Sequence, residues 1–201
     1  MRMTMVVLAA ALLGGCFLAG KRGGETGMTL HDFGTPPPLK EVRARPAKVA
    51  LEIKAPQWLD GLGVNYRLSY ADASQLREYT RSRWAGPPTQ LVAQRLMQTL
   101  DLTAAGQVSG KCVLRIELSE FSQIFASPND SIGLLQGKAL WLDAGRRSLA
   151  ERPWSISSPA ATADARGGVA ALKTVVDRLA GELLDWEQKL TTSGRLRACF
   201  D

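Results

Sequence analysis

The sequence predicts an α+β fold, in which a mostly antiparallel sheet of about five strands carries two helices, the second long and C-terminal. Several short segments alternate apolar and polar residues, as half-buried strands do. Two other segments repeat apolar residues at helical spacing. Their order along the chain is β-β-α-β-β-β-α, which favours a layer of helices on one sheet.

The first fifteen residues have the layout of a secretory signal peptide. Arg2 precedes an apolar run over residues 5–13, which is much shorter than the roughly 20 residues of a transmembrane helix. Residues 13–16 (LGGC) match the bacterial lipobox: an aliphatic residue, two small residues and a cysteine. We therefore expect cleavage before Cys16 and its modification by diacylglycerol and a further fatty acid such as palmitate. The alternatives are an uncleaved anchor and an ordinary signal peptide.

The mature chain would contain 186 residues (201 minus 15), enough for one domain. Without Arg2, 24 basic residues face 19 acidic ones, so the net charge is about +5. This modest, dispersed charge excludes a nucleic-acid partner. Residues 16–46 are rich in glycine and proline and predict a flexible tether, whereas residues 47–201 predict one periplasmic domain.

The domain begins with two predicted strands. Residues 47–54 and 64–72 both alternate apolar and polar side chains. Residues 75–82 are ambiguous between a short strand and a helical turn. Pro87 and Pro88 then suit the first turn of a helix that ends near Leu100, because this turn needs no amide donors.

Three further strands predict an antiparallel meander. Residues 111–119 alternate most clearly, and a turn at 127–130 leads into the neighbouring strand, residues 134–144. The third strand, residues 148–156, contains Pro153 and is therefore expected at an edge of the sheet.

The last predicted element is a helix over residues 164–190 with Asp164 as its N-cap. Its apolar residues step by three and four positions and form a continuous stripe. The stripe predicts packing on the sheet, with a coiled-coil-like contact to another subunit as the alternative. Its members are Val169, Leu172, Val176, Leu179, Leu183, Trp186 and Leu190.

Two cysteines remain after the lipobox. Cys112 and Cys199 are an even pair in an exported protein, so a disulfide between them is one prediction. The other is that Cys112 is a small buried apolar residue.

The residue inventory does not favour an enzyme. The single histidine, His31, falls in the predicted tether, where it is a poor partner for a nucleophile. Glu117 and Glu120 would point to opposite faces of a strand, so we interpret them as surface charges rather than an acid–base pair. The sequence contains no recognisable metal-ligand spacing, nucleotide-binding loop or hydrolase motif, and we expect no cofactor.

One segment carries a candidate partner contact. Trp84 stands beside Arg83 and just before Pro87 and Pro88. Tryptophan and arginine are enriched at interface hot spots, so this group is a candidate for docking. The alternative is a loop tryptophan that covers the core.

The chain resembles a known family over residues 30–186. The resemblance rests on the lipobox, on APQWLDGLGVNYRLSYADASQLREYTRSRWAGPPTQLVAQRL and on LRIELSEFSQIFASPNDSIGLL. These segments are similar to the ABC-type transport auxiliary lipoproteins, the paraquat-inducible protein C-like components that accompany Mce-domain transport systems.

The resemblance implies a non-catalytic subunit without cofactors. It also implies an anchor in the outer membrane on the periplasmic face, assembly into a ring, and a partner Mce-domain protein that spans the periplasm. Such systems move lipids or other hydrophobic molecules between membranes. Phe17, in place of the aspartate that retains many lipoproteins in the inner membrane, also favours the outer membrane. The competing hypotheses are an activator or scaffold of a peptidoglycan-building enzyme, and a lipid-anchored hydrolase.

Overall fold

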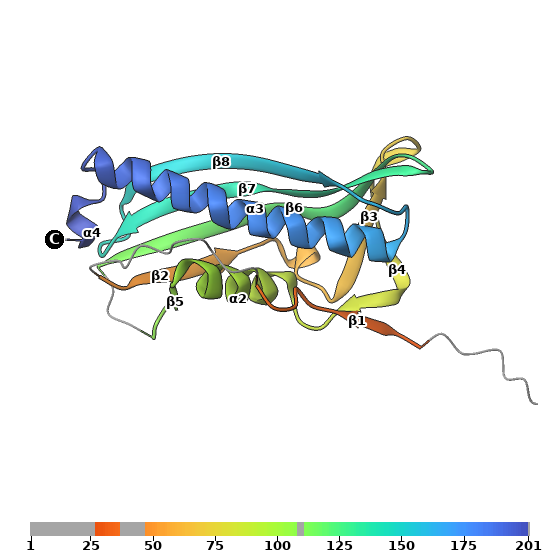
Figure 1. Ribbon diagram of the computed structural model, residues 1–201, viewed down its shortest axis with the longest axis horizontal. Coiled ribbons are helices and arrows are strands. Elements are labelled where there is room, and N and C mark those ends of the chain that lie inside the picture. The colour runs from red at the N-terminus through yellow and green to blue at the C-terminus, as the bar shows by residue number, and fades with distance from the viewer. Residues whose placement is uncertain (1–26, 37–46, 108–110, 201) are drawn as a thin grey trace, which may run out of the picture.

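A computed structural model describes residues 27–36, 47–107 and 111–200. The described residues form two layers, with helices lying across one face of a long twisted sheet (Figure 1). The sheet contains eight strands among these residues. They are β1 (Thr29–His31), β2 (Val49–Lys54), β3 (Gly63–Leu68), β4 (Asp72–Trp84), β5 (Thr103–Ala104), β6 (Cys112–Ser127), β7 (Asp130–Asp143) and β8 (Ser148–Pro159).

The α+β class is confirmed, but the prediction of about five mostly antiparallel strands is wrong. The sheet is mixed: β1–β4, β2–β5, β2–β6 and β3–β6 pair parallel, while β3–β4, β6–β7 and β7–β8 pair antiparallel. Alternation within a strand reports which face is buried and carries no information about the direction of the neighbouring strand. The parallel pairings were therefore outside what local patterns can predict.

The long strand β6 organises the sheet. One edge of β6 pairs with β7 along almost its whole length. Its other edge is shared, because β2 pairs with its first half and β3 with residues 123–125. The sheet therefore divides beyond β6 into a β2–β5 arm and a β3–β4–β1 arm.

Two helices cover the inner face of the sheet. Helix α2 (Pro88–Leu100) lies over the β2–β5 arm, and α3 (Ala165–Thr192) crosses β6, β7 and β8 (Figure 1). Asp164 caps α3, because its side chain accepts a hydrogen bond from the Gly167 amide at 2.9 Å. All seven residues of the predicted stripe are buried, which confirms the packing on the sheet. Burial of each such side chain contributes about 2 kcal/mol.

The C-terminal half follows the prediction closely. β6, β7 and β8 form the expected meander, and β8 pairs only with β7, so that Pro153 lies in an edge strand. A short helix α4 (Arg197–Phe200), which the sequence did not predict, follows α3. The 3₁₀ turn η1 (Gln57–Leu59) precedes β3.

The predicted boundary between tether and domain, at residue 46, lies too far along the chain. β1 pairs parallel with β4, and Phe33 is only 4 % exposed. The ring of Phe33 lies edge-on to those of Trp84 and Phe121, at centroid distances of 5.6 and 6.2 Å. Residues 29–33 therefore belong to the folded domain, because an aromatic ring in this core anchors the strand beside it.

Candidate functional site

Trp84 does not offer a surface to a partner. Its side chain is 1 % exposed and lies 5.6 Å from the Phe121 ring, centroid to centroid. It is the last residue of β4, and its side chain points to the inner face of the sheet. The prediction that this indole anchors a partner is therefore wrong, and the alternative of a tryptophan in the core is correct.

Arg83 faces the opposite side of β4 and is partly exposed. Its Nη2 lies 3.7 Å from Glu78 Oε2, and its Nη1 donates to the carbonyl oxygens of Tyr79 and Ser82. These bonds hold the guanidinium against the sheet. Unlike its neighbour Trp84, Arg83 keeps part of its side chain at the surface, beside the exposed carboxylate of Glu78.

Pro87 and Pro88 start α2 as predicted. Pro88 is the first helical residue, and Pro87 stands in the N-cap position without a side chain that could cap. Asp60 supplies the missing cap from 29 residues upstream: its Oδ1 accepts from the Thr89 amide at 3.0 Å and from the Thr89 hydroxyl at 2.7 Å. These prolines therefore have a structural role in the turn.

Cys112 and Cys199 lie together at one end of the molecule. The structure joins them by a disulfide with a Cα–Cα distance of 5.3 Å. The bond connects the first residue of β6 with α4, across a sequence separation of 87 residues. Both cysteines are 1 % exposed and belong to the main hydrophobic core.

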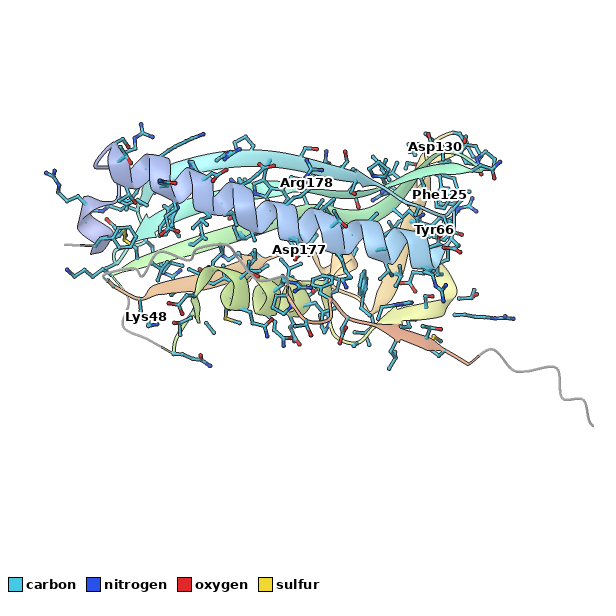
Figure 2. The ribbon with its side chains drawn as sticks, in the orientation of Figure 1. Lys48, Tyr66, Phe125, Asp130, Asp177 and Arg178 are labelled. Atoms are coloured by element: carbon cyan, nitrogen blue, oxygen red, sulfur yellow. A yellow bond between two sulfur atoms is a disulfide. The ribbon has the colours of Figure 1, made fainter. Side chains whose placement is uncertain are left out.

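An ion pair between a buried arginine and a half-buried aspartate links the two helices. Arg95 of α2 is 2 % exposed, and its Nε lies 3.2 Å from Oδ1 of Asp177 on α3. Figure 2 shows Asp177 on the side of α3 that faces α2, whereas Arg178 points toward β8. Burial raises the pKa of Asp177 above its ordinary value of 3.8, against the opposing attraction of Arg95 and Lys173. Removing these two charges from water therefore costs free energy, and their attraction joins α2 to α3 at one defined point.

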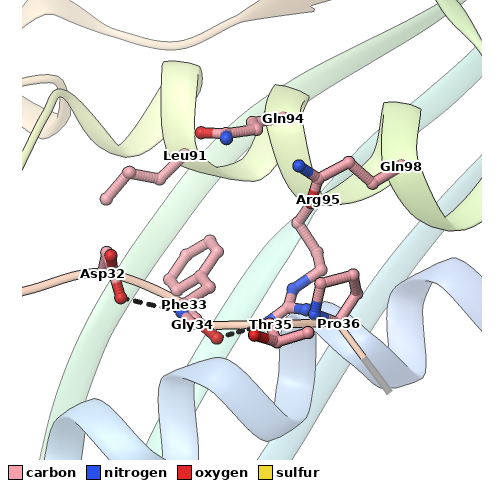
Figure 3. A pocket seen from close by; sticks show the side chains of 9 residues that line it. All are labelled: Asp32, Phe33, Gly34, Thr35, Pro36, Leu91, Gln94, Arg95 and Gln98. Atoms are coloured by element: carbon pink, nitrogen blue, oxygen red, sulfur yellow. Dashed lines mark hydrogen bonds between the residues drawn. The ribbon is translucent and has the colours of Figure 1, made fainter. Parts of the chain in front are cut away.

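A cavity of about 470 Å³ opens beside this pair, between α2 and the segment that follows β1 (Figure 3). The guanidinium of Arg95 makes two contacts with Phe33. It donates a hydrogen bond to the Phe33 carbonyl oxygen, and it lies 5.9 Å from the centroid of the Phe33 ring. Arg95 Nη1 is buried without a hydrogen-bond partner among the described residues. The lining offers hydrogen bonds and apolar surface, and it lacks histidine, cysteine, serine and lysine. It consists of Asp32, Phe33, Gly34, Thr35, Pro36, Leu91, Gln94, Arg95 and Gln98.

The burial of Arg95 was not predicted from the sequence, although the position of this residue in the helix indicates it. Positions 92, 96 and 99 of α2 are all buried, and position 95 falls on the same helical face. A charged residue within an apolar face indicates a buried partner of opposite charge on the neighbouring element. Asp177, one residue after the apolar Val176 of the α3 stripe, fits this requirement.

The described residues bring no catalytic groups together. His31 ends β1, and its Nε2 lies 3.4 Å from the Ser82 hydroxyl, without an acid to orient it. Within residues 27–36, 47–107 and 111–200, no three His, Cys, Asp or Glu side chains are grouped so that they could hold a metal ion. Glu117 and Glu120 bind different cations on neighbouring strands, Lys138 and Arg67, and the Arg67–Glu120 pair is largely buried rather than at the surface.

Cys16 and the predicted signal peptide lie outside the described residues. In the part of the chain that the structure describes, no helix combines the length and apolarity needed to cross a membrane.

Comparison with known proteins identifies the fold. The structure is similar to the crystal structure of protein XCC0632 from Xanthomonas campestris, with a TM-score of 0.65, 18% sequence identity, and coverage of 83% of this chain and 96% of that one. It is also similar to the crystal structure of an uncharacterized protein, with a TM-score of 0.60, 16% identity, and coverage of 79% and 97% of the two chains. No curated protein sequence matches the chain.

The family follows from the sequence match. The model of the ABC-type transport auxiliary lipoprotein component family matches residues 31–183, which include every element from β2 to β8 and most of α3. The family describes auxiliary components of transport systems, and lipoproteins are attached to membranes. The chain therefore belongs to the family of ABC-type transport auxiliary lipoprotein components.

Proposed function

We propose that this protein is a non-catalytic docking subunit of an Mce-type ABC transport system that moves lipids or other hydrophobic molecules between two membranes. A lipid on Cys16 anchors it to the periplasmic face of the outer membrane, and copies of it assemble into a ring. The single observation that carries the proposal is the family match, because it spans both layers of the domain.

The proposed anchor rests on the sequence around Cys16. The lipobox directly follows a short apolar segment, and a triacylated cysteine holds a protein on a membrane far more firmly than one acyl chain does. Phe17 at the following position supports the outer membrane as the destination.

The proposed docking role agrees with how the polar side chains are used. The most deeply buried arginine, Arg95, connects two helices, and the single histidine belongs to the strand pair β1–β4. Ion pairs, including the largely buried Arg67–Glu120 and the more exposed Lys138–Glu117, cross between neighbouring strands. These contacts stabilise a rigid domain, and the histidine–serine contact among the described residues, His31 Nε2 to the Ser82 hydroxyl at 3.4 Å, lacks a third group to orient the imidazole.

The anchor is tested with Cys16→Ser in the full-length protein. The wild-type protein should incorporate labelled palmitate and sediment with outer-membrane vesicles on a density gradient. The variant should keep its signal peptide, incorporate no label and leave the outer-membrane fraction. Normal acylation of Cys16→Ser would contradict the proposal.

A further inference from the structure

Exposed apolar side chains gather where the described chain begins. Met28 and Leu30, at the start of β1, are 56 % and 67 % exposed, more than any other large apolar residue among those described. Within the part of the chain that the structure describes, β1 forms one edge of the sheet and pairs only with β4. A bare apolar edge strand is a liability unless another surface covers it.

The strand register extends this surface across β4. Leu30 lies opposite Arg83, and Arg83 lies opposite Gly63 of β3. Because Trp84 points into the core, Arg83 and Leu30 face outward from the other side of the sheet. We call Met28, Leu30 and Arg83 the β1 edge patch.

The predicted lipid keeps this patch near a bilayer. Eleven residues separate Cys16 from Met28, and an extended chain over these positions spans about 40 Å at most. The patch therefore lies closer to the anchor along the chain than any other apolar surface of the described domain.

The charge of the neighbouring strands suits a phospholipid surface. β3 and β4 contain four arginines, Arg67, Arg77, Arg81 and Arg83, against two acidic residues, Asp72 and Glu78. Apolar side chains flanked by arginine are typical of proteins that rest in the interface of a membrane, where anionic headgroups attract the cation.

We propose that the β1 edge patch rests on the bilayer that holds the Cys16 lipid, with Met28 and Leu30 in the interfacial zone and Arg83 at the headgroups. This inference rests on the proposed lipid anchor. It fixes the orientation of the domain, because β1 and the C-terminal end of α3 lie at opposite ends of the molecule (Figure 1). The disulfide end would then point away from the membrane.

The test uses the full-length lipidated protein in vesicles of phosphatidylethanolamine and phosphatidylglycerol. A nitroxide is attached to Leu30→Cys or, as the control, to Gln188→Cys, an exposed position near the end of α3. Collision rates with oxygen, which enters the bilayer, and with a water-soluble nickel complex report depth. We expect the ratio of oxygen to nickel collisions to be higher at position 30 than at position 188.

Two negative outcomes are distinguishable because flotation of the vesicles is measured in the same samples. If the protein floats and both labels are equally accessible to nickel, the membrane-resting patch is wrong and the anchor stands. If the protein does not float and mass spectrometry finds no acyl group on Cys16, the proposed lipid anchor is wrong. The proposed contact between the β1 edge patch and the bilayer is then wrong as well.

Discussion

Gly133 of β7 lies directly against the backbone of Ala171 in α3. A Cβ atom at position 133 would stand 2.8 Å from the carbonyl carbon of Ala171 and 2.8 Å from the amide nitrogen of Leu172. Nonbonded atoms do not approach so closely, so only glycine allows the long helix to rest on the sheet at this point.

Gly133→Ala should destabilise the domain. The added methyl group meets backbone atoms, which cannot turn away as a side chain can, so α3 has to move off β7. Overpacking of this kind costs about 1–3 kcal/mol. Urea unfolding followed by circular dichroism measures the loss.

Gly181→Ala, on the helix that Gly133 contacts, is the control substitution. No atom lies within 4 Å of a Cβ at position 181, which is in the interior of α3. Alanine in place of glycine within a helix should raise the free energy of unfolding by about 0.5–1 kcal/mol. Equal effects of the two substitutions would contradict the close helix–sheet contact.

The Cys112–Cys199 disulfide should stabilise the fold strongly. In the chain-entropy account, closing a loop of 87 residues contributes about 4.6 kcal/mol. The double variant Cys112→Ala, Cys199→Ala should therefore unfold at lower urea than the oxidised wild type and match the reduced wild type. Two alkylatable thiols in the denatured, unreduced protein purified from the periplasm would show that the bond is absent.

His31 should titrate below its ordinary pKa. Burial at the β1–β4 edge lowers the pKa of His31 from 6.5, because the charged imidazolium loses hydration. The unfolded chain then binds more protons below pH 6.5. The stability that neutral His31 contributes is thus present above pH 6.5 and is lost as the pH falls through the folded pKa.

Nuclear magnetic resonance measures this pKa without ambiguity, because His31 is the single histidine of the chain. His31→Gln should remove the corresponding pH dependence of stability below pH 6.5. A histidine in a free tether would keep the ordinary pKa, so a value of 6.5 or above would contradict the placement of β1 in the domain.

Helices and strands were predictable where the spacing of apolar residues stayed constant along the whole element. The stripe of α3 repeats over about six turns, and both the cap of the helix and its packing follow from the sequence. β6 was predicted to end at residue 119 but continues to Ser127, because the register shifts between Leu118 and Glu120. This bulge changes which positions face the core, so the alternation changes phase there.

Other features depend on contacts that are distant in sequence. β4 is exposed over much of its length, so its polar residues lack the clean alternation of a half-buried strand. β1 has three residues and precedes a run of prolines. The segment is too short to show alternation, so it was assigned to the predicted tether. Trp84 was misread because arginines and prolines surround it in the sequence, although Ser82 and Trp84, two residues apart, share the buried face.

The most direct test of the transport role is the identity of the proteins bound to the full-length lipidated chain. The protein is tagged at its C-terminus, extracted from cell envelopes in mild detergent, purified, and analysed by mass spectrometry and electron microscopy. We expect a ring of this protein bound to an Mce-domain protein, with the permease and ATPase of the same system, and no such complex with Cys16→Ser. Recovery of the wild-type protein with a peptidoglycan synthase, and without an Mce-domain protein, would contradict the proposed function.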